Sequence, residues 1–266
     1  MKRATSPSRQ AGLSMIELLI GLAISSFLII GVTQVFIDNK RSYVFQENQA
    51  GNLENSRFAL NYLEQELAKA GFRRKPDLDP VYAFPADTTL TDCTFAAGEP
   101  VVWNGTKSTL CIRFQARDAA ELDCQGNALS AAEKTSIQKP YVSSAPMFIE
   151  KFTYDATNKS LSCVSSRAVS NSRSAMVNNV AALHFEFGVG PSASKTISSF
   201  KTTPDNPIRA VSYSILMQSQ SSGVRTGSDN PVLTQWKNLY SGDSVSDSQQ
   251  IYQIARGTIV LRNLML

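Results

Sequence analysis

Gly12-Leu13-Ser14-Met15-Ile16-Glu17 begins the stretch of sequence that decides the architecture of this chain, and the residues that follow are almost all apolar as far as position 37. The residues before Gly12 include Lys2, Arg3 and Arg9 and no acidic side chain. An ordinary secretory signal is cleaved after its apolar core, beside small residues, and the core is lost. A cut after Gly12 would instead leave the apolar core at the start of the mature chain.

Residues 18–37 have the length and composition of a helix that crosses the hydrocarbon core of a membrane. Positive residues precede this segment and none lies inside it, which predicts a cytoplasmic leader and export of the remainder. Glu17 is the anomaly, because a carboxylate at the edge of a membrane span costs about 2–3 kcal/mol. That cost favours a charged partner for Glu17, and the alternative is a side chain that snorkels to the lipid headgroups.

The next segment continues the helix without a break, since residues 38–70 contain no proline and a single glycine. Gly71 and Pro76 then provide an end signal. The spacing predicts one continuous helix from about Ser14 to Ala70, and a short coiled coil is the alternative. Apolar or small residues recur at steps of three and four and predict one buried face, formed by Leu53, Ser56, Leu60, Leu63, Leu67 and Ala70.

After Pro80 the apolar residues recur with period two, which is typical of strands. No helical pattern is interleaved with these strands, so the sequence predicts an antiparallel sheet with the striped helix on one face, an α+β fold. Residues 117–145 and 218–250 have little pattern and are expected to be long loops. The predicted strands are residues 109–116, 147–155, 183–187, 211–217 and 258–264.

The net charge gives no general case for nucleic-acid binding. The chain has 26 basic and 22 acidic residues, and removal of the three basic leader residues leaves 23 against 22. A nearly neutral domain does not attract phosphate backbones. Trp236, Lys237 and Tyr240 could stack and pair with single-stranded nucleic acid, but the simpler interpretation is that they anchor the 218–250 loop. No direct nucleic-acid partner is therefore expected.

Four cysteines, all beyond the apolar segment, favour disulfides in an exported domain. Zinc is the competitor, but the cysteines lack Cys-x-x-Cys spacing and His184 is far from them in sequence. Three pairings are possible. The turn at residues 123–127 and a short strand at residues 161–163 favour Cys124–Cys163, and the strand at residues 109–116 then favours Cys93–Cys111.

The sequence contains few features that are typical of an enzyme. His184 is the only histidine, and the chain contains no nucleophile-elbow, phosphate-loop or zinc-helix motif. Strand alternation places His184 and Glu186 on the solvent face, and carboxylate pairs such as Glu64 and Glu66 are interpreted as solvated surface. No catalytic residue, cofactor or metal is predicted.

The basic leader, Gly12, Glu17 and the long apolar segment together resemble the class III signal of type IV prepilins. Residues 45–72, 123–127, 161–163 and 258–263 are similar to blocks of the PilW minor pilins. The resemblance implies that prepilin peptidase cleaves between Gly12 and Leu13, that Leu13 is N-methylated, and that Glu17 pairs with the N-terminal amine of a neighbouring subunit.

The same resemblance implies a division into a removed leader (1–12), a transmembrane half-helix (13–37), an amphipathic half-helix (38–71) and a periplasmic β-rich domain (72–266). It implies a single-pass inner-membrane protein with a cytoplasmic N-terminus, which later joins a cell-surface pilus.

The expected function is that of a minor pilin that primes a type IV pilus near its tip and supports pilus biogenesis, twitching motility and adhesion. Its expected partners are other minor pilins, the major pilin and a tip adhesin. A J-type pseudopilin of type II secretion is the alternative.

Overall fold

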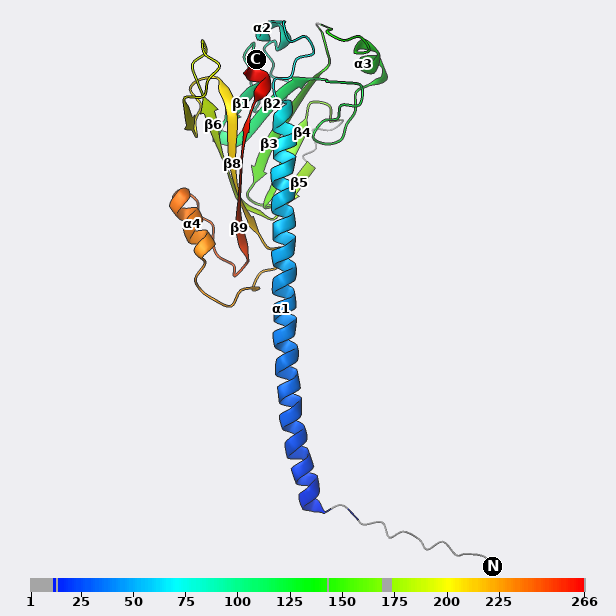
Figure 1. Ribbon diagram of the computed structural model, residues 1–266, viewed down its shortest axis with the longest axis vertical. Coiled ribbons are helices and arrows are strands. Elements are labelled where there is room, and N and C mark those ends of the chain that lie inside the picture. The colour runs from blue at the N-terminus through cyan, green and yellow to red at the C-terminus, as the bar shows by residue number, and fades with distance from the viewer. Residues whose placement is uncertain (1–11, 13, 143, 169–173, 266) are drawn as a thin grey trace, which may run out of the picture. The chain divides into compact units, whose positions relative to one another are not determined.

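The computed structural model describes residues 12, 14–142, 144–168 and 174–265. The chain divides into two compact units, with the boundary between Glu47 and Asn48. One long helix, α1 (Met15–Lys69), begins in the first unit and ends in the second (Figure 1). The predicted continuous helix is thus confirmed to within one residue at each end.

The second unit contains two antiparallel sheets where the sequence predicts one. The first sheet has the order β1 (Val101–Asn104), β2 (Thr109–Gln115), β3 (Met147–Asp155), β4 (Ser160–Ser165) and β5 (Ser174–Asn178), so each strand pairs with its neighbour in sequence. The second sheet has the order β7 (Ser199–Lys201), β6 (Val180–Val189), β8 (Ile208–Gln218) and β9 (Tyr252–Val260). Asn179 separates β5 from β6 and has a left-handed backbone with φ of 60°, a conformation that asparagine tolerates better than most residues. The chain turns there and β6 pairs with β8 instead of extending the first sheet.

The bounds of the strands agree best with prediction where apolar and polar residues alternate clearly. The strand predicted at 147–155 is confirmed as β3, and those predicted at 109–116, 183–187 and 211–217 lie within or nearly within β2, β6 and β8.

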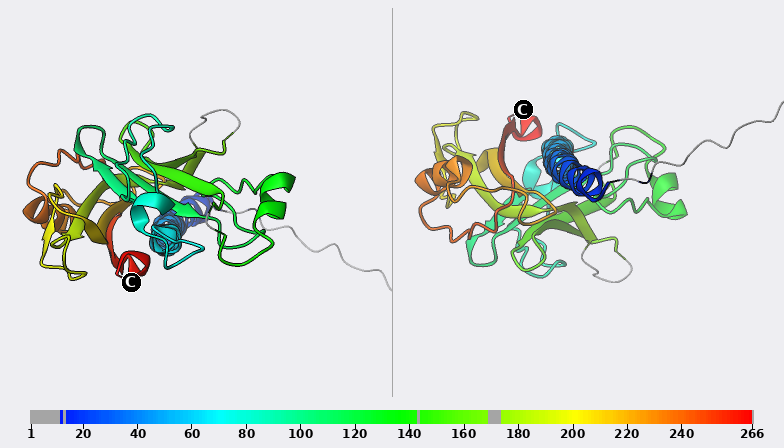
Figure 2. Two further views of the ribbon diagram at one scale, coloured as in Figure 1. Left: turned by 90° about the horizontal axis from the view of Figure 1, so that it is seen from above. Right: turned by 90° about the horizontal axis from the view of Figure 1, so that it is seen from below.

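Short helices interrupt the long loops. α2 (Pro80–Ala83) and α4 (Pro231–Leu239) each start with a proline after an Asp or Asn cap, and α3 (Ala131–Ser136) starts with a capping box. Two 3₁₀ turns, η1 (Gly105–Lys107) and η2 (Arg262–Leu264), complete the secondary structure of the described residues. Within the second unit, α3 and α4 lie on opposite sides (Figure 2).

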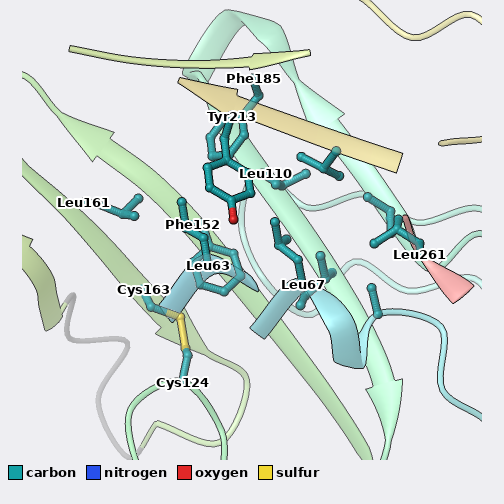
Figure 3. Close-up of a cluster of buried hydrophobic side chains, with 14 of the residues drawn as sticks. Leu63, Leu67, Leu110, Cys124, Phe152, Leu161, Cys163, Phe185, Tyr213 and Leu261 are labelled. Carbon is teal, nitrogen blue, oxygen red and sulfur yellow. A yellow bond between two sulfur atoms is a disulfide. The ribbon is translucent and has the colours of Figure 1, made fainter. Parts of the chain in front are cut away.

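The main core of the second unit lies where α1 meets both sheets. Leu63 and Leu67 of α1 are fully buried and pack among Leu110 and Phe152 of the first sheet and aromatic residues of the second (Figure 3). The Tyr213 hydroxyl of β8 also donates to the Leu60 carbonyl at 3.2 Å. The helix therefore holds two sheets that share no strand.

The buried face of α1 is rotated slightly from the predicted stripe. Leu53 remains 40% exposed, whereas Asn52 is buried and donates from Nδ2 to the Ile251 carbonyl at 3.1 Å. Ser56, Leu63, Leu67 and Ala70 are buried as expected. Hydrophobicity alone misplaces this face because the C-terminal chain offers a backbone acceptor to Asn52.

The end of the chain also differs from the predicted strand at 258–264. The strand β9 begins earlier and stops at Val260, and η2 follows. The side chain of Asn263 donates to the carbonyls of Ala68 and Ala70, both at 3.1 Å, and so caps the end of α1. Gly71, with φ of 73°, leaves space for Leu264, because a Cβ there would lie 2.2 Å from Leu264 Cδ2.

Both disulfides lie in the second unit. Cys93 pairs with Cys111 across a Cα–Cα distance of 5.8 Å, and Cys124 pairs with Cys163 across 6.3 Å. These are the pairings that the sequence favours. The first bridge secures the loop before β1 to the first sheet, and the second fixes the loop after β2 to β4.

Candidate processing and assembly site

Gly12 lies in an exposed, non-helical position shortly before α1. A side-chain methyl group built on it would have no other atom within 4 Å. The backbone at Gly12 is therefore sterically open to an enzyme. Leu13, the other predicted half of the cleavage site and the predicted site of N-methylation, lies outside the described residues.

The first turn of α1 is organised by Ser14 and Glu17. The Ser14 backbone N–H donates to Glu17 Oε2 at 3.0 Å, and the Ser14 carbonyl accepts the helical hydrogen bond from Leu18 N–H at 3.2 Å. The Ser14 hydroxyl accepts a longer bond from Ile16 N–H at 3.4 Å. A carboxylate in the first turn is also stabilised by the positive end of the helix dipole. Glu17 therefore caps its own helix.

Ser14 is a residue that the interpretation of the sequence missed. Ser14-Met15-Ile16-Glu17 has the Ser-x-x-Glu spacing of a capping box, in which the glutamate accepts from the backbone of the serine. The structure contains that half of the motif. The Ser-x-x-Glu spacing is the signal in the sequence for this cap, whereas the charge of Glu17 in an apolar setting suggests pairing with an amine.

The geometry leaves Glu17 able to bind a second donor. Within the part of the chain that the structure describes, the recorded bond to its carboxylate comes from Ser14, and an ionised carboxylate can accept several hydrogen bonds. A cut after Gly12 would create a charged amine on the residue next to Ser14. The arrangement can accordingly hold an ammonium group close to the helix start without losing the cap.

The apolar part of α1 has the properties of a membrane span. It is long and apolar enough to cross a membrane, and its most apolar part is not buried within the protein. Its few hydroxyl groups bond within the helix: Ser25 to the Gly21 carbonyl at 2.7 Å and Thr33 to the Ile29 carbonyl at 2.7 Å. Such internal bonding suits a medium that offers no hydrogen-bond partners.

His184 lies on the face of β6 opposite the core, as predicted, but this face is partly covered and its side chain is 31% exposed. α4 and the turn after it cover this part of β6 and bring Asp243 Oδ2 to 2.9 Å from His184 Nε2. The ring of Tyr240 stacks on His184 with centroids 4.0 Å apart. The alternation of β6 is correct, since Phe185 points into the core on the other face, but sequence periodicity does not reveal that a distant helix covers the polar side.

Trp236 and Tyr240 anchor the loop, as the simpler interpretation of the sequence expects. Trp236 is fully buried, and its indole N–H donates to Asp243 Oδ2 at 2.7 Å. A buried ring cannot stack on a nucleic-acid base.

Glu66 is also misplaced by the sequence interpretation, which assigns it to solvated surface. Its exposed fraction is 9%, and Lys69 Nζ lies 2.7 Å from Glu66 Oε2. Glu64, in contrast, is exposed. Glu66 is buried because the loop at residues 117–129 folds over this end of α1 and brings Glu121 and the Leu122 carbonyl to Lys69.

Metal-ligating side chains do not gather in the described residues, where no group of three or more His, Cys, Asp or Glu is arranged to hold a metal ion.

Comparison with known proteins relates the chain to a family model and to solved structures. Residues 7–33 match the family model described as the prokaryotic N-terminal methylation motif. Among solved structures, the chain is similar to a type IV-like pilin from Thermus thermophilus, with 13% identity, a TM-score of 0.45, and coverage of 81% of this chain and 96% of that one. No curated protein sequence matches the chain.

The N-terminal segment therefore carries a prepilin-type methylation motif, which supports a type IV pilin and fits a membrane-anchored protein. Type IV pilins are structural proteins rather than enzymes. The α+β class predicted from the sequence, a long N-terminal helix with antiparallel sheets, is confirmed by the structure.

Proposed function

We propose that this chain is a minor pilin of the PilW type, which is processed by prepilin peptidase and then built into a type IV pilus at or near its tip. The observation that carries the proposal is the match of residues 7–33 to the methylation motif, together with an acidic first turn on an apolar helix that the protein itself leaves uncovered. Such a helix requires lipid or a neighbouring subunit to cover it.

In this proposal residues 1–12 form the leader, and cleavage releases Leu13 as a new N-terminus that is then methylated. Residues 13–37 hold the subunit in the inner membrane, and residues 38–71 continue the helix into the β-rich periplasmic domain of residues 72–266. Other minor pilins, the major pilin and a tip adhesin are the proposed partners. The resulting pilus would serve biogenesis, twitching motility and adhesion.

Cleavage is tested by the change Gly12→Val, which should leave the precursor uncut and still bound to the membrane, because a branched side chain fills the space beside the scissile bond. Gly21→Val is the matched control, since a Cβ at Gly21 also has no atom within 4 Å. Intact mass spectrometry of the membrane fraction measures the result. A wild-type mature chain that begins anywhere other than at N-methylated Leu13 would contradict the proposal.

Pairing of Glu17 with an amine is tested by comparing Glu17→Gln with Glu17→Ala. Glutamine keeps an oxygen that can accept from Ser14 N–H, whereas alanine removes both the charge and the cap. If the charge recruits a subunit, both variants should insert and be cleaved but should enter pili at least about tenfold less often, equivalent to about 1.4 kcal/mol.

Quantitative immunoblotting of sheared pili measures this incorporation, with Glu47→Gln as the control at an exposed position of the same helix. If Glu17→Gln is incorporated normally and Glu17→Ala is not, Glu17 serves as a cap and has no pairing role. Normal incorporation of both variants would remove Glu17 from the assembly site altogether.

A further inference from the structure

Glu150 occupies an unusual position for a carboxyl group. It lies in β3, the central strand of the first sheet, between Phe148 and Phe152 on the face that packs against α1. Its exposed fraction is 0%. Glu66 projects toward it from α1 and is itself buried. Two acidic side chains therefore meet where the helix packs on the sheet.

The hydrogen bonds around this pair are incomplete unless a proton is present. Glu150 Oε1 accepts from the Cys124 backbone N–H at 2.8 Å, but Glu150 Oε2 is buried without any bonded donor. Among the described residues, Glu150 Oε2 is the one carboxylate oxygen that is buried without a hydrogen-bond donor. The Glu66 carboxyl lies within hydrogen-bonding reach of Glu150. Two carboxylates are both acceptors, so a bond between them forms only when one carries a proton.

The surrounding charges do not neutralise both acids. Lys69 is the cation that reaches Glu66, and it is shared with Glu121, 3.8 Å away, and the Leu122 carbonyl. Asp123 is occupied by the N–H groups of its own turn, and Arg117 lies beside Glu121. Tyr62 adds a phenol from α1, and the partners of Glu150 on β2 and β4 are the uncharged Ile112 and Ser165.

Burial, followed by the proximity of Glu66, raises the pKa of Glu150 well above its ordinary value of 4.5, and Lys69 and the Cys124 N–H oppose this rise only in part. This direction agrees with the geometry, since an apolar environment disfavours the charged form of a carboxyl group.

We propose that Glu66 and Glu150 share one proton in the folded protein, and that this proton fastens α1 and the loop around Cys124 to the first sheet. Loss of the proton places two negative charges side by side among aromatic rings, with one lysine to offset them. Because Glu150 also binds the Cys124 N–H, the helix, the loop and the sheet all loosen at the same point. The contact between α1, the Cys124 loop and the first sheet is therefore sensitive to pH.

A shared proton makes the stability of the folded protein depend on pH in one direction. The folded protein keeps a proton that the unfolded chain releases above about pH 4.5. Stability therefore falls as the pH rises from that value toward the folded-state pKa, and the unfolding equilibrium constant increases by up to tenfold per pH unit. Below about pH 4.5 both states hold the proton and this contribution is constant.

The test measures urea unfolding of the full chain in detergent micelles at a series of pH values between about 5 and about 9. Glu150→Gln keeps the shape of the protonated group and supplies a permanent donor toward Glu66. The unfolding equilibrium constant of this variant should rise less steeply with pH than that of the wild type. The difference between the two slopes should be up to tenfold per pH unit. Glu64→Gln removes an exposed acid from the same helix and should follow the wild-type slope.

A spectroscopic measurement keeps the proposal testable even if Glu150→Gln does not fold. Infrared difference spectra of the wild type near neutral pH should contain the carbonyl band of a protonated carboxyl group, which separates from carboxylate bands. This band should disappear on alkalinisation, and the protection factor of the Cys124 amide, which corrects for the faster intrinsic exchange at high pH, should fall. Glu64→Gln should retain the band near neutral pH. Absence of the band near neutral pH, or equal pH slopes for the wild type and Glu150→Gln, overturns the proposal.

Discussion

Arg113 illustrates how a charged side chain is accommodated inside the second unit. It is 1% exposed and lies on β2, with its guanidinium stacked against the rings of Phe84 and Phe95. It donates to backbone carbonyls of the 84–99 loop, including Glu99 at 2.9 Å and Ala96 at 2.8 Å, and also to Phe84 and Pro85. Burial lowers its pKa to about 10, so it remains charged at neutral pH.

Arg113→Ala should lower the free energy of unfolding by about 3 kcal/mol, because several buried carbonyls lose their donor at once. Arg113→Lys should recover only part of this loss, since an ammonium cannot reproduce the planar fork of donors. Chemical denaturation measures both values. Arg117→Ala is the control at an exposed arginine, and an equal loss there would contradict a specific role for Arg113.

A bidentate ion pair links the short helix α3 to the residues that follow β4. Arg167, which follows β4, donates to Glu133 Oε1 at 2.8 Å and to Glu133 Oε2 at 2.9 Å. The Arg167 hydrogen bonds, followed by those from Ser130, hold the pKa of Glu133 at about 2 despite the opposing effect of partial burial. No residue of α3 itself is buried, but Leu129 before it and Ile137 after it lie in the main core. The ion pair therefore fixes the helix between two anchored ends.

Acidification should therefore loosen α3, between its two anchored ends, before the rest of the second unit unfolds. The depressed pKa contributes stability that is fully present above about pH 4.5 and is lost as the pH falls toward about 2. The protection factors of the amides of residues 131–136, which correct for the slower intrinsic exchange at low pH, should fall between these limits. Arg167→Gln should show fast exchange at all these pH values, and unchanged protection in this variant would refute the ion-pair explanation.

At the level of the entire chain, the two units differ in what surrounds them. The apolar segment of the first unit has no buried residue in its most hydrophobic window. The second unit has its own core around Leu63, Phe152 and Tyr213 and contains both disulfides. The two halves of α1 are therefore suited to different solvents, lipid for the first and water for the second.

A chain that begins at Asn48 should fold as a soluble monomer and should melt within a few degrees of the full-length protein in detergent, because the core contacts of the second unit lie within it. The full chain should aggregate without detergent. Calorimetry and light scattering measure the two properties. A large drop in melting temperature on truncation would show that residues before 48 contribute to the fold of the domain.

Local patterns in the sequence determined the long helix, the strands with clear alternation and the acidic helix start. Each of these depends on neighbouring residues: a helical stripe, a period of two, or a carboxylate three residues after a serine. The sequence favoured the two disulfide pairings among three possibilities, but the fold brings Cys124 and Cys163, 39 residues apart, together. Tertiary structure alone decided the division into two sheets, the covering of His184 by α4, and the meeting of Glu66 with Glu150. These features join segments many residues apart, and a side chain's solvent exposure and proton binding depend on what the folded chain places beside it.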